Sequence, residues 1–207
     1  MIRVMIVDDN AIVRMGLCEA LALKPDLEAA GTAASSAEAI EVFRSERPDV
    51  VTMDYQLPDG NGIDCTRQIL EEFPDARVLI LSAFSAEEDI WNAVQAGAKG
   101  YLTKAAGEVE EIVDAIHEVA SGGSFFPAEI MLKLEHRRNL RELTPREKEA
   151  LRLLVRGKTN KEIAHELGIS IDSVKQHITN LRVKLDAADR TQAAVEAIRR
   201  GIIQLEE

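Results

Sequence analysis

The sequence predicts an α/β domain with a doubly wound parallel sheet of five strands and five helices, followed by a smaller all-α domain of four helices. Two observations predict this division. Through residue 120, short apolar runs alternate with amphipathic segments of helical length, a pattern typical of a parallel sheet covered on both faces. From Leu143 onward only helical periodicity remains, and helix-capping residues mark where the helices begin.

The elements of the first domain follow one another along the chain. Apolar runs predict five strands, at residues 2–7, 27–33, 50–53, 77–81 and 99–102. Helices are expected at residues 12–21, 36–46, 62–72, 86–96 and 108–121. Right-handed crossovers place such helices on both faces of the sheet, and ligands of such sheets bind at the carboxyl ends of the strands.

Three aspartates stand at those carboxyl ends. Asp8 and Asp9 follow the first predicted strand, and Asp54 follows the third. Ionised carboxylates that crowd together repel one another, so the site needs a bound cation or a raised pKa. Hard divalent cations such as Mg²⁺ take oxygen ligands. The sequence therefore predicts one site, built from these three acids, that binds Mg²⁺.

Charge is distributed unevenly between the two halves of the chain. Residues 1–120 carry 9 basic and 23 acidic side chains, a balance of −14, whereas residues 121–207 carry 16 basic and 13 acidic ones, a balance of +3. This asymmetry favours a second half that binds a polyanion.

Cysteine content and hydropathy point to a cytoplasmic protein. Cys18 and Cys65 are the only cysteines and lack the spacing of a metal or redox site, so we interpret them as buried apolar side chains in a reducing compartment. Asp8 and Asp9 interrupt the apolar start that a signal peptide would need. No apolar run approaches the length of roughly 18–20 residues that spans a membrane, and we expect no membrane association.

Residues 121–140 are predicted to be a linker. Glycines and a proline break the strand–helix alternation at residues 121–127. The charged, partly helical stretch that follows contains His136, Arg137 and Arg138, and we interpret it as a solvated connector.

Capping signals divide the second domain into its helices. Thr144 and Glu147 form a capping box around Pro145, which starts a helix that runs to about Arg156. Asn160 is expected to cap a short helix that ends at Gly168, and Ser170 to cap the next one. Two short helices joined in this way make a helix-turn-helix, and a fourth helix is expected at residues 191–201.

Taken together, these motifs resemble the two-domain bacterial response regulators of the NarL/FixJ type. The receiver signature comprises Asp8, Asp9, Asp54, Ser82, Tyr101 and Lys104. The DNA-binding signature comprises LTPRE at residues 143–147, NKEIA at 160–164 and SVKQH at 173–177. The resemblance implies a flavodoxin-like receiver over residues 1–120 and a LuxR-like helix-turn-helix domain over residues 141–207.

The resemblance assigns a role to each receiver residue. Asp54 becomes the phosphoacceptor, a nucleophile that forms an acyl phosphate. Asp9 and Asp54 bind Mg²⁺ directly, Asp8 binds it through water, and Gln56 binds it through its backbone carbonyl. Lys104 pairs with Asp54 or its phosphate, Ser82 donates its hydroxyl to a phosphate oxygen, and Ala83 leaves access open for the phosphoryl group. Tyr101 becomes a rotamer switch coupled to Ser82, with core packing alone as the alternative. Many receivers have proline after the lysine, often with a cis bond, where this chain has Ala105.

In the second domain, the helix that begins after Ser170 is expected to enter the major groove of duplex DNA. The expected base contacts are Lys175, Gln176 and Thr179, which share a helical face. The expected phosphate contacts are Asn160, Lys161, Arg182 and Lys184. The last helix carries a second apolar stripe, predicted to form a homodimer contact through Ala194, Ala197 and Ile198.

These features predict a transcription regulator that a sensor histidine kinase switches by phosphorylating Asp54. An aspartyl-phosphate phosphatase would carry a second aspartate two residues after the nucleophile, where this chain has Gln56, so we expect no enzyme. The alternative is a regulator that binds DNA without phosphorylation and uses its receiver as a dimerisation or adaptor module.

Overall fold

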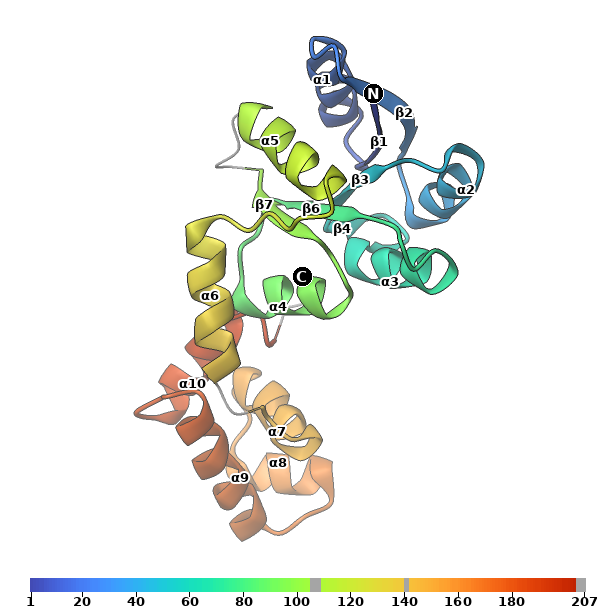
Figure 1. Cartoon of the computed structure of the whole chain (residues 1–207). Coiled ribbons are helices and arrows are strands. Elements are labelled where there is room, and N and C mark those ends of the chain that lie inside the picture. Colours follow the sequence, from blue (N-terminus) through green and yellow to red (C-terminus); the bar gives the residue numbers. More distant parts are fainter. Residues whose placement is uncertain (105–108, 140–141, 204–207) are drawn as a thin grey trace. The chain divides into compact units, whose positions relative to one another are not determined.

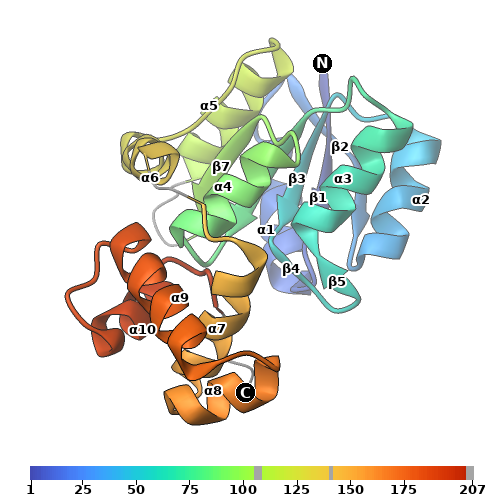
Figure 2. The ribbon, with the colours of Figure 1, turned by 90° about the horizontal axis from the view of Figure 1, so that it is seen from below.

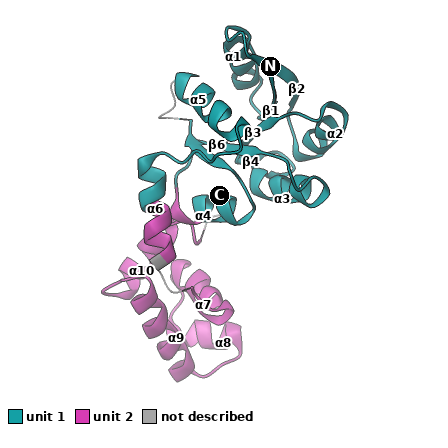
Figure 3. Cartoon of the chain, in the orientation of Figure 1, with its two compact units in different colours: residues 1–85, 89–132 teal, residues 86–88, 133–207 magenta. Residues whose placement is uncertain are grey.

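The computed structural model describes residues 1–104, 109–139 and 142–203. The chain divides into two compact units (Figure 3), one formed by residues 1–85 and 89–132, the other by residues 86–88 and the chain from residue 133 onward. The bond between Lys104 and Ala105 lies outside the described residues, as does the expected start of a helix at residue 108.

The first unit is built on a five-stranded parallel sheet. Its strands lie in the order β2-β1-β3-β6-β7. They span the ranges β1 (Ile2–Val7), β2 (Leu27–Ala33), β3 (Val50–Asp54), β6 (Val78–Ser82) and β7 (Gly100–Thr103). The prediction of a parallel five-stranded sheet is confirmed. The last two strands begin and end one residue later than the apolar runs predicted, so β6 includes Ser82.

Helices cover both faces of this sheet. Figure 1 shows α1 and α5 on one face, and Figure 2 shows α2 and α3 beside each other on the opposite face. Their ranges are α1 (Ala11–Ala22), α2 (Ser36–Glu46), α3 (Gly62–Glu72), α4 (Glu87–Gln95) and α5 (Val109–Ala120). A core of fully buried side chains from β1, α1 and α5 includes Ile6, Leu21 and Ile116.

A small hairpin follows β3. It pairs β4 (Gln56–Leu57) with β5 (Gly60–Asn61) in antiparallel fashion. Gly60 has a φ of 157°, a backbone conformation that L side chains rarely adopt. Asn61 then caps α3 by accepting a hydrogen bond from the backbone N–H of Asp64. The hairpin therefore fixes the path of the chain directly after Asp54.

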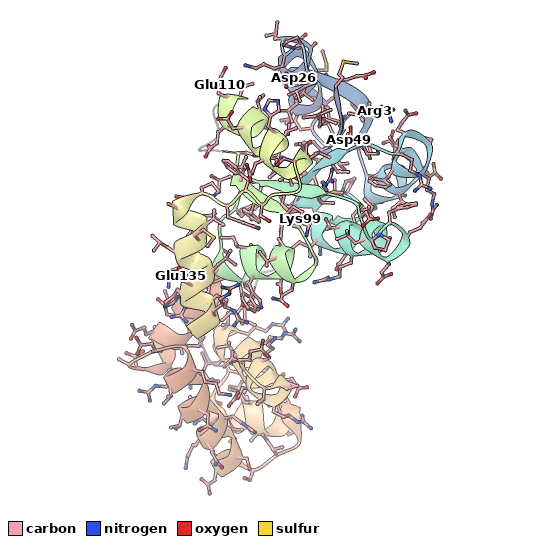
Figure 4. All side chains as sticks on the ribbon, viewed as in Figure 1. Arg3, Asp26, Asp49, Lys99, Glu110 and Glu135 are labelled. Carbon is pink, nitrogen blue, oxygen red and sulfur yellow. The ribbon has the colours of Figure 1, made fainter. Side chains whose placement is uncertain are left out.

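At the opposite end of the sheet, polar contacts join the amino ends of the strands. The backbone N–H of Arg3 in β1 donates to Asp49, just before β3, at 2.8 Å (Figure 4). His117 of α5 and Asp26, just before β2, lie 2.6 Å apart through Nε2 and Oδ2. These contacts lie away from the aspartate cluster, which occupies the carboxyl ends.

The stretch expected to be a solvated connector is partly structured and partly buried. Phe125 exchanges backbone hydrogen bonds with Lys99 and Tyr101, extending the edge of β7 by an isolated bridge. Helix α6 (Ala128–Asn139) follows, and its Ile130 is fully buried. The interpretation of the stretch after residue 127 as a solvated connector is therefore wrong for Ile130.

The second unit contains the four expected helices. They are α7 (Pro145–Val155), α8 (Asn160–Leu167), α9 (Ile171–Lys184) and α10 (Arg190–Arg199). Their shared core includes Leu151, Ile163 and Leu181, all fully buried. No helix within the described ranges is both long enough and apolar enough to cross a membrane.

The caps of these helices confirm two predictions and correct a third. Thr144 and Glu147 form the predicted capping box, and Ser170 caps α9. The cap of α8 is Thr159 rather than Asn160, because Thr159 and Glu162 make a second capping box. Asn160 is the first residue inside the helix.

Candidate functional site

The three aspartates meet at the carboxyl edge of the sheet. Strands β1 and β3 are parallel neighbours with Val7 opposite Met53, so Asp8 and Asp54 come side by side. One carboxylate oxygen from each of Asp8, Asp9 and Asp54 lies within 4.8 Å of the other two. The strand register thus brings together acids that are 45 residues apart in sequence numbering, from residue 9 to residue 54.

Lys104 closes the site from the end of β7. Its Nζ lies 2.7 Å from Asp8 Oδ2 and 2.9 Å from Asp54 Oδ2. Burial disfavours the charged ammonium, yet the hydrogen bonds to Asp8 and Asp54 prevail and raise the pKa of Lys104. The lysine therefore stays charged and balances part of the negative charge.

Burial sets the electrostatics of Asp54. Its side chain is nearly fully buried, as is that of Asp8, whereas Asp9 is exposed. Burial raises the pKa of Asp54, and the nearby Asp8 adds to this, while the hydrogen bond from Lys104 opposes it. The backbone N–H of Gln56 also donates to the Asp54 carboxyl group, which places the start of β4 beside the site.

The donor set fits a hard divalent cation. The three acids supply carboxylate oxygens, the ligand atoms that such ions prefer. Lys104 supplies only one positive charge against them. Exposed Asp9 leaves one side of the cluster open to solvent.

A second group of side chains flanks the acids on β6 and β7. The Ser82 hydroxyl at the end of β6 accepts a hydrogen bond from the backbone N–H of Phe84 at 3.0 Å. Tyr101 is fully buried in β7, and its hydroxyl donates to the carbonyl of Phe84 at 2.8 Å. Burial raises the pKa of Tyr101, so its hydroxyl stays protonated. Ala83 is exposed between these contacts and adds no bulk to the loop.

Two residues near the acids, Phe84 and Tyr55, were not predicted from the sequence to take part in the site. The backbone N–H of Phe84 donates to the Ser82 hydroxyl, and the Phe84 carbonyl accepts from the Tyr101 hydroxyl. A phenylalanine side chain gives no indication of this backbone role. Tyr55, the residue after Asp54, donates its hydroxyl to Asp89 of α4 at 2.6 Å. The sequence shows a tyrosine directly after the strand-end acid. It does not show the hydrogen-bond partner of that tyrosine, because the partner lies 34 residues away.

In the second unit, α9 presents a polar face. Lys175, Gln176 and Thr179 are exposed, while Val174 and Ile178 are buried in the helical core. Lys175 pairs with Asp172 one turn earlier at 2.9 Å. The Thr179 hydroxyl donates to the Lys175 carbonyl at 2.9 Å.

The four side chains expected to hold phosphates differ in their surroundings. Lys161 is exposed at the start of α8, and Asn160 accepts a hydrogen bond from Arg190 at 3.4 Å. Lys184 instead pairs with buried Glu147 at 2.7 Å and donates to the Glu142 carbonyl at 3.0 Å.

The remaining cation of this set, Arg182, is also committed to its own domain. Its guanidinium donates to the Ala188 carbonyl in the turn that follows α9. The placements of Arg182 and Lys184 therefore do not support contacts with phosphate. Both side chains stabilise the helical domain instead.

The last helix corrects the predicted dimer contact. Ala197 is fully buried in the core of its own domain, together with Ala193. Ala194 is half-buried, and Ile198 is 39% exposed. The apolar side chains that α10 leaves to solvent are Ile198 and Val195. A contact through Ala197 is excluded because no partner can reach a side chain that its own helices cover.

Comparisons with known proteins cover both units. Residues 4–117 match the family model of the response regulator receiver domain, and residues 141–197 match that of the bacterial regulatory proteins of the luxR family. The transcriptional regulatory protein LiaR of Bacillus subtilis (strain 168) is 39% identical over 211 residues, which cover 98% of this chain and 100% of LiaR. The response regulator protein VraR of Staphylococcus aureus is 36% identical over 208 residues, covering 98% of this chain and 99% of VraR.

A solved structure agrees with this fold over most of the chain. The RcsB response regulator of Salmonella typhimurium superposes with a TM-score of 0.78 at 23% identity, covering 94% of this chain and 98% of RcsB. At that identity the likeness concerns the fold alone.

Proposed function

Because the chain belongs to the two-component response regulators that join a receiver to a LuxR-type DNA-binding domain, we propose that a sensor histidine kinase phosphorylates Asp54 and thereby switches the binding of duplex DNA. The observation that carries this proposal is the grouping of Asp8, Asp9 and Asp54 around Lys104. A solvated acidic face would neither bury two of its carboxylates nor place a shared ammonium between them.

The chemistry at Asp54 is the transfer of one phosphoryl group. A carboxylate oxygen of Asp54 forms a bond to phosphorus. At the same time the bond between phosphorus and the donor atom breaks, and the electron pair of that bond leaves with the donor. A magnesium ion, held by Asp9 and Asp54 directly, by Asp8 through water and by the Gln56 carbonyl, would neutralise charge on the transferring oxygens. Lys104, already hydrogen-bonded to Asp54, pairs with the product phosphate.

Ser82, Ala83 and Tyr101 carry the signal away from the site. The Ser82 hydroxyl can turn from the Phe84 amide toward a phosphate oxygen, and Ala83 leaves the approach open. That turn frees the loop to which the Tyr101 hydroxyl is bonded. Phosphorylation adds about −1.5 to −2 charge beside these groups, which favours a second arrangement of the loop.

In the DNA-binding domain, the exposed face of α9 reads base edges. Lys175 and Gln176 offer the donors and acceptors that suit guanine and adenine, and Thr179 lies on the same face. Lys161 and Asn160 at the start of α8 bind backbone phosphates and set the register. The homodimer on DNA forms through the apolar side chains that α10 exposes, Ile198 and Val195, with Ala194 beside them.

Intact-mass analysis tests the phosphoacceptor directly. The full chain is incubated with acetyl phosphate and Mg²⁺, with and without EDTA. We expect one added phosphoryl group on the wild type with metal, and none on Asp54→Asn. Labelling of Asp54→Asn, or wild-type labelling that survives EDTA, would contradict the proposal.

A further inference from the structure

Tyr55 connects the phosphoacceptor loop to α4. It follows Asp54 directly and is half-buried, and its hydroxyl donates to Asp89 Oδ1 at 2.6 Å. Asp89 lies in the first turn of α4 and is itself buried. A buried carboxylate requires hydrogen-bond donors, so this contact contributes to the position of α4.

The backbone of Tyr55 is held independently of its side chain. Its N–H donates to the carbonyl of Leu81 in β6 at 3.2 Å, and its carbonyl accepts from the N–H of Gly62 at the start of α3 at 2.8 Å. The Tyr55 main chain is therefore anchored to two elements. Movement of α4 relative to the sheet would break the contact at the hydroxyl and leave the backbone contacts in place.

The chain contains two tyrosines, and both hold the segment that leads into α4. Tyr101 holds the Phe84 carbonyl before the helix begins, and Tyr55 holds Asp89 inside the first turn. Asp89 and Asp54 both act electrostatically on the Tyr101 hydroxyl, where each adds to the effect of burial in raising the pKa of Tyr101. Asp89, which binds the residue next to Asp54, thus acts on the same buried hydroxyl as Asp54 does.

We propose that the Tyr55–Asp89 hydrogen bond is a latch that holds the first turn of α4 in its unphosphorylated arrangement and makes Tyr55 a positioning residue for the phosphorylation of Asp54. The inference rests on the proposed function. Phosphorylation places about −1.5 to −2 charge beside Asp54, and this charge disfavours a second carboxylate held nearby. The Tyr55–Asp89 bond stabilises the arrangement of α4 that phosphorylation disfavours. The bond and phosphorylation therefore shift the same equilibrium between two arrangements of α4 in opposite directions.

Removing the hydroxyl should therefore favour phosphorylation. In the full chain, we expect Tyr55→Phe to be labelled by acetyl phosphate at least about fivefold faster than wild type. Asp89→Ala should give a comparable gain, and the double variant should gain little more than either single one, because both remove the same bond. Asp114→Ala is the matched control, since it deletes an exposed acid of α5 in the same unit and should be labelled at the wild-type rate.

Trp91 provides a readout that a purely structural role would not move. It is the only tryptophan and lies in α4, two residues after Asp89. Wild-type emission should shift when acetyl phosphate and Mg²⁺ are added. The emission of unlabelled Tyr55→Phe should already be displaced in the same direction, whereas that of Asp114→Ala should match unlabelled wild type.

The outcomes separate this inference from the proposed function. If the wild type is not labelled, the proposed function itself fails. If the wild type is labelled but Tyr55→Phe is labelled at the same rate or more slowly, the latch is overturned. Additive effects of Tyr55→Phe and Asp89→Ala overturn it as well. Should Asp89→Ala not fold, the labelling rate and the Trp91 emission of the isosteric Tyr55→Phe decide alone.

Discussion

One ammonium group, that of Lys104, pairs with two of the three clustered aspartates. Lys104 reaches Asp8 and Asp54 at hydrogen-bond distance, and both carboxylates are nearly fully buried. Removing one partner of a buried ion pair leaves the other charge without compensation. The stability of the receiver should therefore depend on this one side chain unless another cation takes its place.

Replacing that lysine tests the dependence. We expect Lys104→Met to lower the free energy of unfolding by about 2–3 kcal/mol in EDTA, somewhat below the value for a fully buried pair because Lys104 is partly exposed. Added Mg²⁺ should restore more stability to Lys104→Met than to wild type, because a cation that binds only the folded state stabilises it. Urea denaturation with and without Mg²⁺ measures both quantities. Equal responses of the two proteins to Mg²⁺ would argue against a cation site at these acids.

Two lysines of the DNA-binding domain should differ in what they recognise. Lys175→Ala should weaken binding to a specific duplex by about 1–3 kcal/mol, because it removes a base contact. Lys161→Ala should weaken binding to specific and random duplexes alike. It should also reduce the slope of log affinity against log salt concentration by about one unit. Fluorescence anisotropy titrations over a range of salt concentrations compare them. Parallel losses on both duplexes for both variants would refute the distinction.

At the scale of single elements, caps explain why some helices were placed correctly from sequence. Asn61 and Ser170 stand directly before α3 and α9, and such residues mark helix starts from local sequence alone. Thr159 and Asn160 are both capping types in succession, and only Glu162, three residues after Thr159, decides between them. That signal is present in the sequence and was overlooked.

Other features depend on residues far apart in sequence, and local patterns could not supply them. Lys184 pairs with Glu147 across 37 positions, a contact that only tertiary packing creates. Helix α10 has more apolar positions than one buried stripe needs. Only the packing of the domain decides that Ala197 is buried and Ile198 exposed. The acid cluster was predictable because parallel strand ends meet at one edge of a sheet.

A carboxyl cap supplied to α2 from the hairpin, in addition to the N-cap residue Ser35, gives a prediction that depends on pH. Asp59 of the hairpin accepts hydrogen bonds from the backbone N–H groups of Ser36 and Ala37 at 2.8 and 3.0 Å, and these bonds lower its pKa. A carboxyl group whose pKa is lowered by folding contributes stability above its unfolded value, about 3.9, and loses the contribution as the pH falls through the folded value. Asp59→Ala should therefore be less stable than wild type at neutral pH, and the difference should shrink below about pH 4.

Urea denaturation of both proteins over a pH series measures that difference. Asp75→Ala, which removes another exposed aspartate of the same unit, is the control and should show little difference at any pH. A deficit of Asp59→Ala that is constant from neutral to acid pH would show that the cap does not act through its charge.

Two substitutions in α10 distinguish an effect on folding from an effect on dimerisation. Ala197→Glu places a charge in the core of the helical domain and should unfold that domain. Ile198→Glu places the same charge on the exposed face, so the domain should fold while cooperative binding to paired half-sites is lost. Circular dichroism melting and titrations of single and paired half-sites distinguish the two. A folded Ile198→Glu chain that still binds paired half-sites cooperatively would locate the dimer contact elsewhere.

At the scale of the whole molecule, two units with different charge and chemistry are joined in one chain. The acidic first unit carries the aspartate cluster, and the second carries the polar face of α9. Each unit has a hydrophobic core of its own. The proposed function couples the two units, because phosphorylation of the first is expected to change the affinity of the second for DNA.

The measurement that tests this coupling most directly is the affinity of the full chain for a specific duplex, determined with and without acetyl phosphate in the presence of Mg²⁺. We expect phosphorylation to increase the affinity of wild type at least about fivefold and to leave that of Asp54→Asn unchanged. Wild-type affinity that is the same before and after stoichiometric labelling of Asp54 would contradict it, and would indicate a regulator that binds DNA independently of its receiver.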